Sequence, residues 1–119
     1  MQIFLKTEDE INLMRKANQL VGATLAELGK HIKPGVTTLQ LDKVAEEFIR
    51  DHGAIPTFKN FPNPYGESFP ASICTSINDV VVHGIPSDND VLDDGDIISI
   101  DCGTLLDGYN GDSCYTFAV

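Results

Sequence analysis

The sequence predicts an α+β domain in which two helices pack on an antiparallel sheet. Apolar residues recur at helical spacing from Ile11 to Ile49, whereas apolar and polar residues alternate from position 71 onward, as they do in strands. A third signal, Asp107-Gly108 between two strand-like runs, is typical of a two-residue hairpin turn. The length of 119 residues suits one domain, so we expect residues 1–119 to fold as a single unit.

The first helix is predicted to begin after Thr7. Thr7 and Glu10 have the spacing of a capping box, in which two side chains satisfy free backbone N–H groups of the first turn. Lys33-Pro34-Gly35 should end this helix, because proline and glycine interrupt helical structure. The helical stripe consists of Ile11, Met14, Asn18, Val21, Leu25, Leu28 and Ile32.

A second helix is predicted to begin after Thr37. Thr37 and Gln40 form another capping box, and Gly53 fits the position just past the end of the helix. One apolar face is made by Leu41, Val44, Ala45, Phe48 and Ile49.

Residues 54–69 are predicted to form an ordered aromatic loop. Prolines at this density exclude a helix and a central strand. The aromatic residues either line an apolar pocket or pin the proline-rich loop to the core, and composition alone does not separate these alternatives. The pocket candidates are Phe58, Phe61, Tyr65, Phe69 and Cys74.

Four strands are expected after this loop, and no repeat or linker interrupts them. They are placed at residues 71–77, 80–83, 97–106 and 109–119. Asn78-Asp79 would form the turn between the first two, and residues 84–95 a loop rich in aspartate and proline.

Charge and cysteine content restrict the partners and the compartment. The formal net charge of −10 argues against binding to nucleic acid or to an anionic membrane surface. No apolar run approaches the length that crosses a membrane, so membrane insertion is not expected. Cys74, Cys102 and Cys114 are odd in number and lack the spacing of a disulfide framework, which favours a reducing, cytoplasmic location.

The hairpin raises the question of why Asp101 and Asp112 occupy strand positions. If Asp107-Gly108 is a two-residue turn, Gly103 faces Asp112, and Asp101, Gly103 and Asp112 share one face of the sheet. Two carboxylates about 6 Å apart repel each other by about 3 kcal/mol at an effective dielectric constant of 20. A shared proton, a basic side chain or a metal ion would offset this repulsion, and carboxylate oxygens suit divalent cations.

Two other interpretations of these acids remain open. Acidic residues near hairpin turns are usually solvated on an exposed face. A bulge at Gly111 would place Asp101 and Asp112 on opposite faces of the sheet and remove the argument for a shared ion.

His83 ends the run Val80-Val-Val-His83 just before Gly84. A single histidine in this position is more often a hydrogen-bonded structural residue than a catalytic one. Gly84 would allow a ligand or another backbone segment to approach closely, so a role at a site is the alternative.

Four blocks of sequence together resemble type I methionine aminopeptidase. They are Asn78-Asp-Val-Val-Val-His-Gly-Ile-Pro86, Asp94-Gly-Asp-Ile97, Ile100-Asp101 and Gly108-Tyr-Asn-Gly-Asp112. The resemblance covers the whole chain. The spacing of the two aspartates alone would also admit prolidase-like and creatinase-like relatives, whereas the segment Val81-Val-His-Gly-Ile-Pro86 favours the aminopeptidase.

The resemblance implies half of a pita-bread fold and removal of the amino-terminal methionine from nascent proteins. By the same resemblance, Asp101 and Asp112 bind two divalent ions (Co, Mn, Fe or Zn), and His83 contacts the substrate as a catalytic residue. Phe58, Tyr65, Phe69 and Cys74 correspond to the pocket for the methionine side chain. Asn78 and Val80 correspond to a backbone site for a monovalent cation.

The resemblance also implies that the remaining metal ligands lie in a carboxy-terminal half, which is absent from these residues. We therefore expect the chain to be inactive alone, and to self-associate through an apolar sheet face that would otherwise be uncovered. A non-catalytic half that serves as a binding or assembly module is the alternative function.

Overall fold

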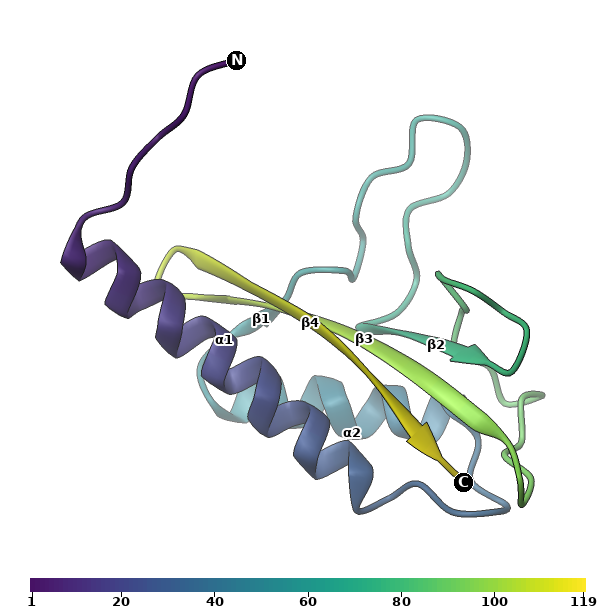
Figure 1. Ribbon diagram of the computed structural model, residues 1–119. Coiled ribbons are helices and arrows are strands. Elements are labelled where there is room, and N and C mark those ends of the chain that lie inside the picture. Colours follow the sequence, from purple (N-terminus) through teal and green to yellow (C-terminus); the bar gives the residue numbers. More distant parts are fainter.

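The computed structural model describes residues 1–119 and confirms two helices packed on one face of a four-stranded antiparallel sheet (Figure 1). The elements are α1 (Glu8–Gly29), α2 (Thr38–Asp51), β1 (Ile55–Pro56), β2 (Ile73–Ile77), β3 (Ile97–Leu106) and β4 (Tyr109–Ala118).

Strand β3 is the centre of the sheet. The short strands β1 and β2 pair with one edge of β3, and β4 pairs with the other edge along all ten residues. Asp107 (φ 51°) and Gly108 (φ 82°) have the two positive φ angles of a type I′ turn, which suits the twist of the flanking strands. The register runs without interruption from Leu106–Tyr109 to Ile97–Ala118, so the hairpin contains no bulge.

Both helices begin where the capping residues predict. The Thr7 side chain accepts a hydrogen bond from the N–H of Glu10, and Thr37 and Gln40 form the complete capping box. α1 ends at Gly29, earlier than expected, because the N–H of Lys30 bonds the carbonyls of Glu27 and Leu28 in a tightened last turn. The buried core joins both helices to the sheet and includes Val21, Leu28, Leu41, Ala45, Ile49, Ile73, Leu92, Ile98, Ile100 and Cys102, all fully buried.

The expected strand at 80–83 is wrong, because this segment is an exposed loop. Asn78 (φ 52°) and His83 (φ 61°) both have left-handed backbone conformations, which end extended structure. The loop returns to β2 at Gly84, whose carbonyl accepts the N–H of Thr75 at 2.8 Å. β2 also begins two residues later than expected, because the N–H groups of Ser72 and Ile73 bond the side chain of Asp42.

Two segments project from the body on the side of the sheet that the helices leave open (Figure 1). One is the extended amino-terminal segment before α1. The other is the aromatic loop, residues 57–72, which we call the pocket loop. No helix in the structure is long and apolar enough to span a membrane.

The close contact between α1 and β4 generates a first prediction. A Cβ atom at Gly111 would lie 2.6 Å from the carbonyl oxygen of Ala17, a backbone atom that cannot move freely. Gly111→Ala should therefore lower the free energy of unfolding by about 1–3 kcal/mol in urea titrations. Gly22→Ala is the matched control, since nothing lies within 4 Å of that position in the middle of α1. It should stabilise the protein by about 0.5–1 kcal/mol, and equal effects at the two glycines would contradict the packing described here.

Candidate active site

The hairpin register places the two candidate metal ligands on one face of the sheet. Gly103 is directly opposite Asp112, and Asp101 is opposite Cys114, so Asp101 and Asp112 are diagonal neighbours. Gly103 places no side chain between them, and an added Cβ there would collide with Oγ1 of Thr57 and, at 2.7 Å, with the ring of Phe58. The alternative with a bulge, which would have separated the acids, does not apply.

The surroundings of Asp101 disfavour its negative charge. Burial and, after it, the neighbouring Asp112 carboxyl group together raise the pKa of Asp101 to about 6, while His83 opposes the shift. Oδ1 of Asp101 is buried and has no hydrogen-bond partner within the protein. A buried, unpartnered carboxylate oxygen beside a second carboxylate is the donor set that a divalent cation satisfies.

The chain by itself supplies only part of a metal site. Nowhere do three or more His, Cys, Asp or Glu side chains come together in an arrangement able to hold an ion. Asp101 and Asp112 therefore fit a divalent cation in chemistry but are too few to enclose it, since such ions take six or more oxygen ligands or a closed set of four.

His83 reaches the same site from the loop after β2. The loop lies directly against β2, because Gly84 donates its N–H to Oγ of Ser76 at 3.1 Å and accepts the N–H of Thr75. A Cβ atom at Gly84 would collide with the carbonyl of Thr75, so only glycine allows this approach. The positive φ of His83 is a local strain of the kind that occurs at functional sites.

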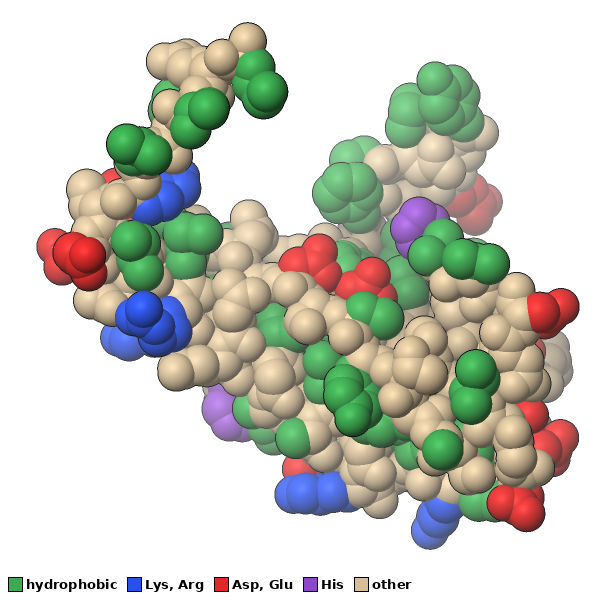
Figure 2. Space-filling view, in the orientation of Figure 1, with side chains coloured by type: hydrophobic (Ala, Val, Ile, Leu, Met, Phe, Trp, Pro, Cys, Tyr) green, Lys and Arg blue, Asp and Glu red, His purple; other side chains and the backbone are tan.

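A cleft of about 720 Å³ joins these groups to the pocket loop. Figure 2 shows acidic side chains gathered in the hollow between the two projecting segments, with a histidine at its rim and the lysines and arginines lying elsewhere. The rings of Phe58 and Phe69 meet edge to face at 6.5 Å. The apolar lining consists of Phe58, Phe61, Pro62, Pro64, Phe69, Pro70, Cys74 and Ile85.

Some predicted residues lie outside the cleft. Tyr65 is 96% exposed at the tip of the pocket loop and does not line the cleft, because the Asn63–Tyr65 turn directs it to solvent. Asn78 and Val80 occupy the turn after β2 and are exposed. The side chain of Asn78 bonds Asp96 and the N–H of Ile97, which fixes this turn against the start of β3.

Asn18 is a supporting residue that the sequence did not single out. Its Oδ1 accepts the N–H of Asp112 at 3.1 Å, and its Nδ2 donates to the carbonyl of Met14 at 2.9 Å. The bond ties the backbone of one candidate ligand to α1. The signal was present, since Asn18 is the one amide in an otherwise apolar helical stripe.

The open face of the sheet is polar, so the expected apolar face is wrong. Ser99, Asp101, Asp112, Cys114 and Thr116 share this face by register, and Oγ of Ser99 lies 2.7 Å from Oγ1 of Thr116. Ile98, Ile100 and Cys102 of β3 point to the helices and are fully buried, whereas Ile97 lies on the open face and is 49% exposed. Self-association through this face would therefore bury mainly polar side chains.

The chain belongs to a family of metallopeptidases. Residues 12–119 match metallopeptidase family M24, and the chain belongs to this family. The chain is also similar along nearly its whole length to methionine aminopeptidases. It is 56% identical over 117 residues to the methionine aminopeptidase of Clostridium acetobutylicum and 51% identical to methionine aminopeptidase 1 of Bacillus subtilis, covering 98% of this chain and 45% of each relative. The chain thus spans about half the length of these curated relatives.

Solved structures agree with this assignment. The crystal structure of methionine aminopeptidase from Rickettsia prowazekii matches 99% of this chain and 45% of its own, with a TM-score of 0.91 and 44% identity. The Xaa-Pro dipeptidase from Bacillus anthracis matches 97% of this chain and 29% of its own, with a TM-score of 0.75 and 25% identity. The half pita-bread architecture implied by the sequence is confirmed, and the methionine aminopeptidases are the more similar of the two groups.

The raised pKa of Asp101 gives a second prediction, for metal-free protein. The folded-state pKa of about 6 lies above the ordinary value of 3.8, so the folded protein binds a proton more readily than the unfolded chain. Stability should fall as the pH rises between these two values and stay low above them. Asp101→Asn has a neutral amide in place of the carboxyl group, so its stability should not fall with pH in this way. Its free energy of unfolding at neutral pH should exceed that of the wild-type protein by about 1 kcal/mol.

Urea titrations with a chelator at about pH 4.5 and pH 7 test this expectation. Asp107→Asn, the same substitution at the exposed hairpin turn, is the control and should change little. A wild-type protein that equals Asp101→Asn in stability at pH 7 would show that the acidic pair carries no unfavourable energy.

Proposed function

We propose that the chain forms the amino-terminal half of a metal-dependent aminopeptidase that removes the first methionine from nascent proteins. The observation that carries this proposal is the convergence of Asp101 and Asp112, without a bulge, in one cleft with His83 and an apolar wall. The similarity to methionine aminopeptidases over 98% of the chain supports the choice of substrate.

In this proposal Asp101 and Asp112 would hold two divalent ions through their carboxylate oxygens. When bound, such ions supply Lewis acidity and an activated water for hydrolysis. His83, held at the cleft by Gly84, would donate an imidazole N–H to the carbonyl oxygen of the scissile bond and so stabilise the charge that develops there. A buried Oδ1 on Asp101 without a protein partner is consistent with its role as a ligand.

The apolar wall would receive the methionine side chain. Phe58 and Phe69 line the cleft with their rings edge to face, and Cys74 lies beside Asp101 across the β2–β3 pair. Burial raises the pKa of the Cys74 thiol to about 11, so it remains neutral and apolar in character at physiological pH. An unbranched thioether chain fits such a surface, because it is flexible and makes favourable contacts with aromatic rings.

Further ligands have to come from outside residues 1–119, on the same polypeptide or on a partner chain. Residues 1–119 would act as one domain. Self-association could use β4, which pairs with β3 on one edge only, since an unpaired strand edge can accept another strand. The three free cysteines favour a reducing, cytoplasmic location, and the net charge of −10 disfavours nucleic acid as a partner.

A third prediction concerns Asp112 in a protein that contains the complete ligand set. Asp112→Asn should lower the affinity for Mn²⁺ or Co²⁺ and the hydrolysis of methionyl peptides together, because a neutral amide is a poorer ligand for a cation. Calorimetric titration and a peptidase assay measure the two effects. Asp107→Asn serves as the control in the same hairpin. Unchanged metal stoichiometry with unchanged turnover would remove Asp112 from the site.

His83 provides the fourth prediction. His83→Ala in the same complete protein should lower kcat about 100-fold, the cost typical of a lost donor to a developing oxyanion, while Tm changes little. His31→Ala, at an exposed position just past the end of α1, is the control. A large loss of stability with a proportionate loss of activity would instead support the structural interpretation of His83.

Residues 1–119 alone are expected to bind metal weakly and to lack peptidase activity, since two carboxylates are present where a closed site needs more ligands. A methionyl-peptide assay with added Co²⁺ or Mn²⁺, run beside sedimentation analysis, measures this. Inactive protein that nevertheless binds a partner chain would favour the binding or assembly module. Substantial turnover by a monomer would show that two acidic ligands suffice.

A further inference from the structure

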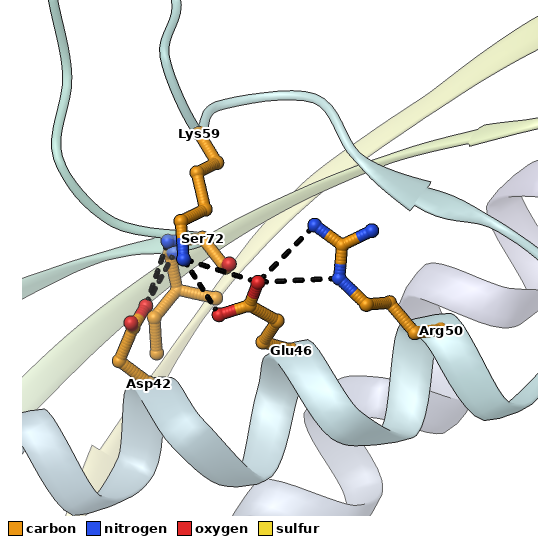
Figure 3. Close-up of polar contacts among 6 residues, drawn as sticks. Asp42, Glu46, Arg50, Lys59 and Ser72 are labelled. Carbon is orange, nitrogen blue, oxygen red and sulfur yellow. Dashed lines mark hydrogen bonds and ion pairs between the residues drawn. The ribbon is translucent and has the colours of Figure 1, made fainter.

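A row of polar side chains on α2 lies beneath the pocket loop. Asp42, Glu46 and Arg50 follow one another at four-residue intervals along this helix (Figure 3). We infer that Glu46 and Asp42 are positioning residues of the pocket: they hold the two ends of the pocket loop and thereby set the pocket's selectivity for an unbranched apolar side chain. This inference rests on the proposed function, which assigns the pocket to methionine.

The first anchor fixes the start of the loop. Nζ of Lys59 donates to both carboxylate oxygens of Glu46, at 3.1 and 2.9 Å. The side chains of Lys59 and Glu46 are only 34% and 23% exposed, so water screens this ion pair less than a surface pair. The bond from Lys59 is the main cause that lowers the pKa of Glu46. Lys59 follows Phe58 directly, so the anchor acts next to an aromatic wall residue.

The second anchor fixes the end of the loop. Oδ1 of Asp42 accepts the N–H groups of Ser72 and Ile73 at 2.8 and 3.1 Å. Asp42 is 5% exposed and Ser72 is fully buried, so both N–H groups would lack a partner without this carboxylate. Burial raises the pKa of Asp42, and the two N–H bonds oppose that rise. Ile73 begins β2, and Cys74 of the pocket is the next residue.

Backbone bonds between the two anchors transmit their positions to the aromatic wall. The N–H of Asn60 bonds the carbonyl of Phe69 at 2.8 Å, and the N–H of Phe69 bonds the carbonyl of Phe61 at 3.0 Å. Phe58 and Phe69 therefore lie at the base of the loop, where backbone hydrogen bonds join its two arms and α2 holds each arm. The tip lies beyond that base, and residues 61–68 are all exposed.

Arg50, the third residue of the row, pairs with Glu46 from the side away from the pocket loop. Its Nη2 and Nε lie 3.2 Å from Oε1 of Glu46, but it makes no hydrogen bond or ion pair with the loop (Figure 3). Removing Arg50 thus breaks one ion pair of Glu46 and leaves the loop anchor intact. The structure in this way supplies a matched control for the experiment.

The experiment exchanges the charges of the first anchor in the 119-residue chain. Lys59→Glu should accelerate amide hydrogen exchange at Asn60 and Phe69 about fivefold, as expected for the loss of a partly buried pair. It should also lower the affinity for L-methioninol relative to L-alaninol, measured by NMR titration. Lys59→Glu with Glu46→Lys should restore both values, whereas Arg50→Met should leave both unchanged. Mn²⁺ affinity should stay constant throughout, because neither residue touches the acidic pair.

The second anchor is tested with Asp42→Asn and Asp42→Ala. Asp42→Asn keeps an accepting oxygen, so amide hydrogen exchange at Phe69 and Ser72 should remain slow. Asp42→Ala removes the acceptor, so exchange at both amides should become faster. Equal exchange rates in all variants, or no restoration in the charge-exchanged pair, would overturn the inference. Failure of the wild-type chain to bind methioninol, with exchange rates as expected, would overturn the assignment of the pocket and leave the anchoring in place.

Discussion

The register between β3 and β4 is the constraint on which the rest of the structure depends. Ile98, Ile100 and Cys102 are fully buried against the helices, so the residues between them must face the other side of the sheet. A slip of one residue would expose these side chains and turn Asp101 into the core. Each buried aliphatic side chain contributes about 1.5–3 kcal/mol, so the core selects this register strongly. The apolar face thus determines where the carboxylates point.

Signals that are local in the sequence predicted their structure well. Thr7 and Thr37 cap the helices that they were expected to cap, because a cap depends only on residues three positions apart. Asp107-Gly108 fixed the hairpin, and counting from this turn placed Asp101, Gly103 and Asp112 on one face. The geometry of the acidic pair therefore followed from one turn and the alternation of a strand.

Features that depend on distant contacts did not follow from the sequence. Asn18 lies 94 residues from the N–H that it accepts, and Asp42 lies 30 residues from Ser72. Their positions depend on how each helix lies on the sheet, which periodicity does not specify. The valines at 80–82 have high strand propensity, but they have no partner strand, and the left-handed residues Asn78 and His83 bend the chain away. Tyr65 shows the same limit, since composition cannot say which aromatic residue of a loop turns outward.

The short connection between Asp101 and Asp112 has a consequence for the order of folding. A two-residue turn closes this hairpin, so its residues meet with little loss of loop entropy, and hairpins form within microseconds. In a hairpin that formed before α1 and α2 docked, the two acidic groups would already lie side by side. Repulsion between them opposes this early step, and a dissolved cation near the nascent hairpin would relieve it. In that case the ionic composition of the medium would act on the folding rate of the chain as well as on the finished site.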